Sequence, residues 1–273
     1  MLRLETETGY YLITHPDHAR LAALFAGHWG NAQFTPPRPR TSVLHGIRVH
    51  DDGWAARDAS PSTTREGKPS AFSTELVGAY SAFEEIDLEA YLAVREEAVE
   101  LVEAIDPYAA LLVSMHTYNL LTARADRSTI VPAQLPLLDA FLDRQRARQM
   151  RLLEVVRNDP EYTAEEVSDK AVLNNFRLLQ ATDNLSLLSC VAHRKAATCL
   201  HPLPTEDGGE SRIAVIPVGE RQFRLAPWPF DQPEIRTCVK ARHVEGRRFV
   251  SSEELAERYR RAAVQELDVV LTS

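Results

Sequence analysis

The stretch RVHDDGW, residues 48–54, places a histidine and two aspartates at the end of a segment that otherwise has the pattern of a buried helix. Apolar residues recur before it three and four positions apart, as they do on the inner face of a helix. His50 and Asp51 follow one turn later and flank that face, about 100° apart around the axis. We therefore expect a helix over 41–52 that ends at Gly53 and presents an imidazole and a carboxylate to the interior.

Three more helical patterns carry a polar residue inside an apolar stripe. His18 lies in the first helix, His116 in the helix that follows Pro107, and Asp183 in a long helix from about 163 to 198. A lone histidine at such a position is more often a hydrogen-bonded core residue than a ligand. A buried carboxylate needs a cation, a metal or a hydrogen-bond network, because its desolvation is costly. For Asp183 the network stays open as an alternative.

The polar residues in these four helices all have side chains that can bind a metal ion. Three imidazoles and two carboxylates form a ligand set that suits zinc, manganese, iron or cobalt and leaves room for water. The sequence therefore predicts a divalent metal ion as cofactor, with these ligands: His18, His50, Asp51, His116 and Asp183.

Composition narrows the class of partner. The chain has 273 residues, of which 44% are apolar, enough for an ordinary globular core. Its 31 basic and 39 acidic residues give a net charge of -8, which offers no footprint for long nucleic acid or an anionic membrane. The sequence has no apolar run of membrane-spanning length, and its three cysteines form no close pair. We expect a cytoplasmic protein that acts on a small molecule.

Helical periodicity extends to about residue 200, and short strand patterns follow it. The helix-start signals are Thr14, Asp106-Pro107, and capping boxes at 163–166 and 251–254. The expected strands cover 212–218, 221–228, 235–244 and 267–272. We therefore expect a mainly α fold, with a helical domain over residues 1–200 that holds the site and a small α/β C-terminal appendage over 201–273.

The order of the expected ligands resembles the HD-domain superfamily of metal-dependent phosphohydrolases. In that superfamily the ligands are a first histidine, an adjacent His-Asp pair and a distant aspartate, all within a helical bundle. The resemblance implies an HD-like bundle and hydrolysis of a small phosphorylated metabolite or nucleotide. HD proteins with two metals usually have two further histidines, whereas His116 is the only histidine between the doublet and Asp183. This departure favours one metal, or a second one held mainly by carboxylates such as Asp52.

A closer resemblance covers nearly the whole chain. The sequence is similar to an uncharacterised bacterial family known only as a domain of unknown function, and that similarity brings no known activity. It is carried by ITHPDHARLA (13–22), VHDDGW (49–54), LVSMH (112–116), FRLLQATDNLSL (176–187) and APWPF (226–230).

Four residues, one of them the expected ligand His116, have further candidate roles. Asp52 is the closest candidate for a general base, and the competing interpretation is a helix-end or solvent-facing acid. His116 either completes the metal shell or contacts substrate. Gln180, one turn before Asp183, could orient a ligand. Trp54 would form a wall of the pocket, although a plain core tryptophan fits equally well.

Substrate phosphates need cations, and Arg65 and Lys68 in the long polar loop over 58–73 are the candidates. Two other functions remain open. The same ligand set can hold iron for oxygen chemistry, as in the HD-like inositol oxygenases. The chain could instead be a helical binding module with a structural metal or none.

Overall fold

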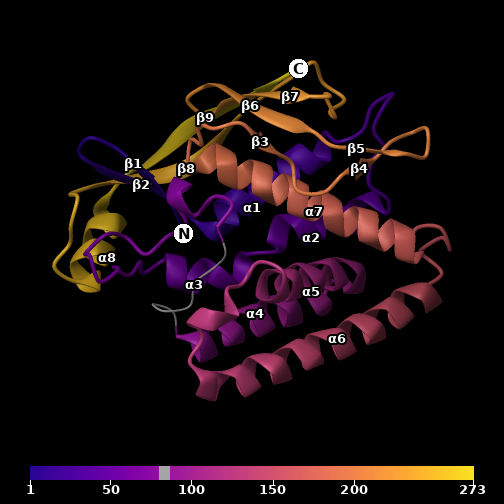
Figure 1. Cartoon of the computed structure of the whole chain (residues 1–273), viewed down its shortest axis with the longest axis horizontal. Coiled ribbons are helices and arrows are strands. Elements are labelled where there is room, and N and C mark those ends of the chain that lie inside the picture. Colours follow the sequence, from indigo (N-terminus) through magenta and orange to yellow (C-terminus); the bar gives the residue numbers. More distant parts are fainter. Residues whose placement is uncertain (80–86) are drawn as a thin grey trace.

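The computed structural model describes residues 1–79 and 87–273 (Figure 1). The α-helices of the described residues are α1 (His15–Gly27), α2 (Arg40–Val49), α3 (Ala55–Asp58), α4 (Leu88–Glu103), α5 (Pro107–Thr122), α6 (Leu135–Asn158), α7 (Asp169–Cys190) and α8 (Ser252–Arg261). Short 3₁₀ turns are η1 (Asp52–Trp54), η2 (Thr74–Leu76), η3 (Arg127–Thr129) and η4 (Pro132–Gln134).

Helices begin where the sequence carries side chains that can accept from free backbone N–H groups. Thr14 accepts from the backbone N–H of Asp17 at the start of α1, and Asp106 accepts from Ala109 at the start of α5. Ser251 caps α8 in the same way. These starts confirm the predicted signals.

Two predicted helices are shorter than expected. α2 ends at Val49, before the His-Asp doublet, and α7 ends at Cys190 instead of continuing to about residue 198. The capping box at 163–166 forms its hydrogen bonds, but it closes a separate turn, and Ser168 caps α7.

The strands of the described residues are β1 (Leu2–Glu5), β2 (Gly9–Ile13), β3 (Ala197–Thr198), β4 (Leu203–Pro204), β5 (Glu210–Ser211), β6 (Ala214–Gly219), β7 (Gln222–Ala226), β8 (Glu234–Glu245) and β9 (Val264–Thr272). Seven of them form one sheet in the order β1-β2-β8-β9-β7-β6-β3, and β4 pairs with β5. β7 and β9 are parallel, and the other pairs are antiparallel.

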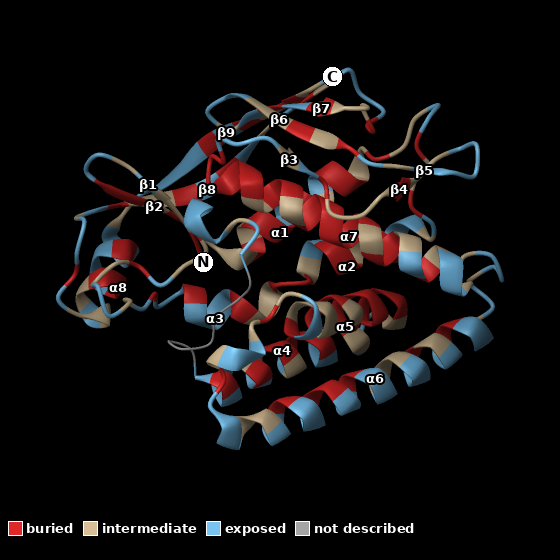
Figure 2. Ribbon diagram, in the orientation of Figure 1, coloured by how far each residue is buried: buried red, intermediate tan, exposed pale blue. Residues whose placement is uncertain are grey.

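The elements form layers (Figure 1). The sheet covers α1 and α7, which pack against each other, and α2 and α5 follow beneath them. α4 and α6 pack against α5 on the side away from the sheet. α7 is buried along most of its length because it lies between the sheet and α5 (Figure 2). A polar side chain on the inner faces of α7 is therefore held within the body of the protein.

The expectation of a mainly α fold with a small C-terminal appendage is wrong. The protein is mixed α/β, with 48% of the chain in helices and 21% in strands. The physical reason is long-range pairing: β2 near the start of the chain pairs with β8, so that Tyr10 lies opposite Val244. One continuous apolar cluster also joins helix residues such as Phe25 to sheet residues such as Phe223 and Val269.

The sheet combines residues from both sides of the expected boundary at residue 200. The division into a domain over 1–200 and another over 201–273, taken as separately folding units, stays a prediction.

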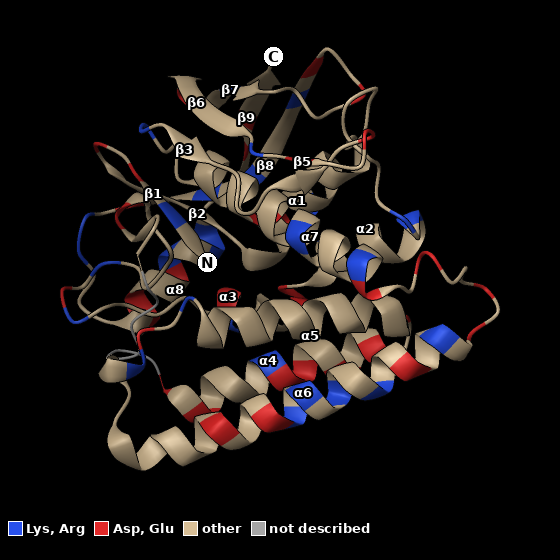
Figure 3. Cartoon of the chain, turned by 45° about the vertical axis from the view of Figure 1, so that its right-hand side comes forward, with Lys and Arg blue, Asp and Glu red and all other residues tan. Residues whose placement is uncertain are grey.

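Charged residues of α4 and α6 face one another along their length (Figure 3). Arg148 on α6 lies 2.9 Å from Glu96 and 3.4 Å from Glu103 on α4. The basic run over 144–151 is thus engaged with acids of the neighbouring helix. Within the described residues, none of the helices combines the length and the apolar character that crossing a bilayer requires.

Candidate metal centre

The structure brings the five predicted ligand residues together from four parts of the chain. His18 comes from α1, His50 and Asp51 from the end of α2, His116 from α5 and Asp183 from α7, and all five are buried. They form two groups that share His50. The groups are His18–His50–Asp51 and His50–His116–Asp183, and within each group one ligand atom per residue lies within 4.8 Å of the others. These buried groups could hold a metal ion.

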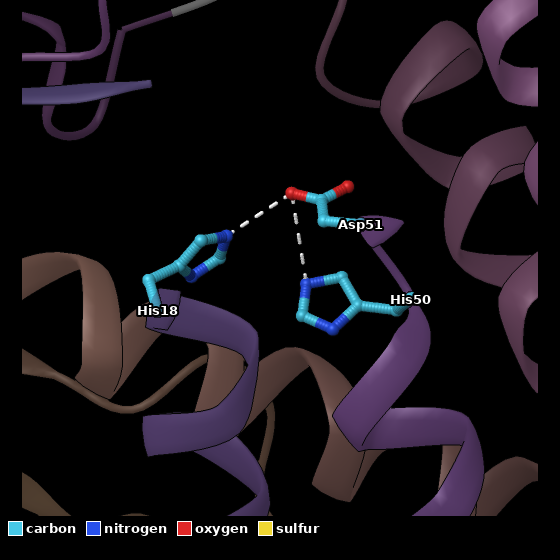
Figure 4. Close-up of side chains that lie close together, drawn as sticks. All are labelled: His18, His50 and Asp51. Atoms are coloured by element: carbon cyan, nitrogen blue, oxygen red, sulfur yellow. Dashed lines mark hydrogen bonds and ion pairs between the residues drawn. The ribbon is translucent and has the colours of Figure 1, made fainter. Parts of the chain in front are cut away.

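The doublet owes its geometry to the end of α2, not to two positions on one helix. His50 keeps helical backbone angles, whereas Asp51 leaves them at φ -121° and ψ 14°. His18 and His50 both extend toward the same carboxylate oxygen of Asp51 (Figure 4). Gly53 lets this turn pack closely on α4, because a Cβ there would lie 2.7 Å from the Cβ of Ala98.

The tautomer of His18 is set by a hydrogen bond on its outer nitrogen. The hydroxyl of Ser186 donates to the backbone carbonyl of Asp183 at 2.8 Å, so its oxygen is free to accept from Nδ1–H of His18 at 3.0 Å. In that tautomer Nε2 carries a lone pair, and it lies 3.1 Å from Oδ2 of Asp51. Two acceptors at that distance need a proton or a cation between them.

The imidazole of His50 is also fixed by a hydrogen bond on its outer nitrogen, and its inner nitrogen faces two carboxylates. Its Nδ1–H donates to the carbonyl of Ile47 at 2.7 Å, so that Nε2 faces inward. Nε2 lies 3.4 Å from Oδ1 of Asp183 and 3.8 Å from Oδ2 of Asp51, and it has no hydrogen-bond partner. Burial lowers the pKa of His50, but the charges of Asp51 and Asp183 outweigh that effect and raise the pKa to about 9. The position therefore attracts positive charge.

Asp51 is held by a buried cation that sequence reasoning missed. Nη1 of Arg95 on α4 donates to Oδ1 of Asp51 at 2.6 Å, and both residues are buried. Burial raises the pKa of Asp51, but Arg95 and His50 more than offset this and hold the pKa well below its usual range. The signal was present in the sequence: Arg95 interrupts the apolar stripe of α4 between Leu92 and Val99.

Asp183 is the residue that all three imidazoles approach. Its carboxylate lies 3.6 Å from Nδ1 of His18, 3.4 Å from Nε2 of His50 and 4.0 Å from Nε2 of His116. Burial raises its pKa, but the neighbouring histidines lower it overall, so the carboxylate stays ionised. Burial lowers the pKa of His116 to about 3, which keeps that ring neutral and able to bind a cation.

The predicted accessory residues take different positions. Asp52 lies in η1 outside both groups, and its Oδ1 is buried without a hydrogen-bond partner. The ring of Trp54 lies 5.0 Å from the ring of His15 between centroids, and its centroid lies 5.1 Å from the guanidinium of Arg95. Gln180 hydrogen-bonds to Asn119 and to a second residue, His201, on the loop after β3.

The structure does not bring the two predicted phosphate contacts to the five residues. Arg65 and Lys68 lie in a turn over 64–68 that pairs with Phe249, in the segment before α8. Nζ of Lys68 lies 3.8 Å from the carboxylate of Glu66. Spacing along the chain could not reveal this, because the loop is anchored by a segment almost 200 residues away.

Comparison with curated proteins and with solved structures finds no significant match. A family model does match, over residues 1–246, and it covers all five clustered residues, the sheet strands β1 and β2 and the whole of β8. That family is described as protein of unknown function DUF3891. The chain belongs to this family, DUF3891.

Proposed function

We propose that this protein is a metal-dependent hydrolase that holds one divalent cation among the five clustered residues. A single observation carries the proposal. The outer nitrogens of His18 and His50 are both fixed by hydrogen bonds, which turns their inner nitrogens toward ionised carboxylates in a buried space. In the metal-free protein a proton on His50 lies among these groups, and a metal ion would replace it. Fixed outer nitrogens are typical of metal-binding histidines.

The shared use of His50 favours one cation over two. Both groups need Nε2 of His50, and that nitrogen has only one lone pair. The charges agree with this count. Arg95 offsets one of the two carboxylates, so the site retains a single negative charge, and one divalent ion already brings its net charge to +1.

A bound divalent cation would supply an activated water and polarise a phosphoryl oxygen. Side chains near the cation would supply the general base, the substrate contact and the pocket wall. Asp52, whose buried Oδ1 has no partner, is the proposed general base. His116 either completes the ligand set or contacts the substrate through Nδ1, which also has no partner. Trp54 forms part of the wall beside Arg95.

The substrate we propose is a small phosphorylated metabolite or nucleotide. The order His18, His50-Asp51, His116 and Asp183 resembles that of the HD-domain phosphohydrolases, which supports phosphate-ester hydrolysis. The net charge of -8 supports a small substrate over long nucleic acid.

Elemental analysis of protein purified without added metal tests the site. We expect about one divalent ion per chain in the wild type and in H28A, and loss of most of it in H50A and D183A. H28A is the matched control, because His28 pairs with Asp231 outside the site at 3.0 Å. Full stoichiometry in both H50A and D183A would remove the basis of the proposal.

Turnover tests the reaction. Nucleotides, sugar phosphates and a generic aryl phosphate should be screened with manganese, cobalt, zinc and iron. We expect metal-dependent hydrolysis that falls sharply in D51A, because the variant loses a ligand and the partner of Arg95. Oxygen consumption by the iron-loaded protein without hydrolysis would indicate an oxygenase instead. A bound metal with neither reaction would indicate a binding module.

A further inference from the structure

A polar contact between α5 and α7 continues beyond the metal residues. Asn119 lies one turn after His116 on α5, and Gln180 lies one turn before Asp183 on α7. The two amides meet, and Nε2 of Gln180 donates to Oδ1 of Asn119 at 2.7 Å. The buried amide of Gln180 and the half-buried amide of Asn119 thus form a second polar layer, one helical turn from the candidate metal centre.

His201 completes this layer from the other side. Its Nε2–H donates to Oε1 of Gln180 at 2.5 Å. We name Asn119, Gln180 and His201 the amide layer. His201 has a left-handed backbone, with φ 65°, which is uncommon for a residue with a side chain.

A bulge in the hairpin explains this backbone. Thr198 pairs with Ala214 and Leu203 pairs with Ser211, so the four residues 199–202 lie opposite only two. Such irregularities redirect side chains and are frequent next to active sites. Here the bulge directs His201 onto α7.

Three arginines lie on the same elements as the amide layer. Arg177 lies one turn before Gln180 on α7, Arg124 lies just beyond the end of α5, and Arg212 lies opposite the bulge in the hairpin. Burial, followed by the charges of these three arginines, lowers the pKa of His201. Their places on α7, after α5 and in the hairpin agree with this effect, and they gather positive charge at one site of a protein whose net charge is -8.

Several donors of the amide layer and its three arginines have no partner within the described residues. Among the described residues, Arg124 and Arg212 make no ion pair, and Arg177 contacts only the half-exposed Glu210, at 2.7 Å. Within the same part of the chain, Nδ1 of His201 and the amide NH₂ of Asn119 have no hydrogen-bond partner. Unpaired guanidinium and amide donors next to a buried site are the groups that bind phosphate and carboxylate.

We propose that the amide layer and its three arginines bind a second anionic group of the substrate, a phosphate or a carboxylate. The inference rests on the proposed function, in which a first phosphate reacts at the metal centre. Asp183 and Arg177 are six residues apart on α7, about 9 Å along its axis and about 120° around it, so the two anionic groups would be well separated. The preferred substrates are then molecules with two separated negative groups, and a simple aryl monophosphate is a poor one.

Calorimetric titration of metal-free protein at low ionic strength tests the binding, with inorganic phosphate and succinate as the probes. We expect the wild type to bind at least one of them, and R124A/R212A to bind it at least tenfold more weakly. R127A/R236A is the matched control, because it removes two other arginines with exposed ion pairs. Tighter binding of phosphate than of succinate would assign a phosphate, and the reverse would assign a carboxylate.

A merely structural amide layer would behave differently. In that case R124A/R212A would bind the probes as the wild type does, and that result overturns the inference, as does a wild type that binds neither probe. Failure of the proposed function looks different, since it appears as unchanged metal content in H50A and D183A. If turnover is found, R124A/R212A should raise KM with little change in kcat for substrates with two anionic groups, and should raise the KM of the aryl phosphate far less.

Discussion

At the residue scale, the charge of the site depends on Arg95 as much as on the ligands. Asp51 and Asp183 are both ionised and buried, and Arg95 neutralises one of them permanently. A buried carboxylate that loses a cationic partner is costly, because the charge remains without water around it. A bound metal ion would compensate part of the negative charge that Arg95 otherwise neutralises.

The first prediction therefore concerns R95M. We expect the metal-free variant to lose about 3–5 kcal/mol of unfolding free energy, the usual cost of removing one partner of a buried ion pair. The loss should be smaller in the metal-loaded protein, since the cation then compensates Asp51. Chemical denaturation with and without bound metal measures both values. R151M is the control: it breaks an exposed pair with Glu103 and should change stability by less than about 1 kcal/mol. Equal losses in the two states would contradict the argument.

The candidate ligands could be found from the sequence, while their supporting residues could not all be found. His18, His116 and Asp183 stand out because each interrupts an apolar stripe, and the structure brings them together. Arg95 carries the same signal on α4, but it has no metal chemistry to attract notice. The link from Ser186 to His18 depends on how α1 packs on α7, which no local pattern encodes.

At the element scale, most helix starts were predictable, although the start of α7 lies after the predicted capping box, and helix ends were less predictable. Thr14 and Asp106 cap their helices through their own side chains, so a few residues contain the whole signal. α2 ends at Val49 because the next turn tightens against α4, which lies 40 residues further along the chain. The four tail strands were placed within a few residues, since their alternating patterns are local.

The second prediction concerns the close contact at η1. In G53A the added Cβ would lie 2.7 Å from the Cβ of Ala98 and 2.8 Å from the carbonyl oxygen of Val94, so η1 and α4 must move apart. We expect a loss of about 1–3 kcal/mol in stability, typical of overpacking, and weaker metal binding because Arg95 moves with α4. G27A is the control, since its Cβ meets nothing within 4 Å and adds helix propensity. Thermal unfolding and metal titration measure the two effects. A G53A variant with unchanged stability and metal binding would contradict this prediction, because η1 and α4 would then accommodate the added Cβ without cost.

At the scale of the whole molecule, the sheet connects the two ends of the chain around the helices. β2 pairs with β8, and the sheet covers α1 and α7, which carry His18 and Asp183. Local patterns could predict the strands but not their order, because the pairing of Tyr10 with Val244 spans more than 230 residues. That is why the sequence suggested an appendage where the structure has a sheet built into the core.

The last prediction follows from this pairing. We expect a fragment of residues 1–200 not to fold alone, because β2 would lose β8 and the apolar faces of α1 and α7 would lose the sheet. Circular dichroism should show no cooperative unfolding, and the fragment should bind no metal. The control is the full chain with a protease site in the exposed turn over 206–209, cut after folding: its two pieces should stay associated and retain the metal. Cooperative unfolding and metal binding by the isolated fragment would instead establish residues 1–200 as a domain, with the sheet strands β8 and β9 dispensable for the site.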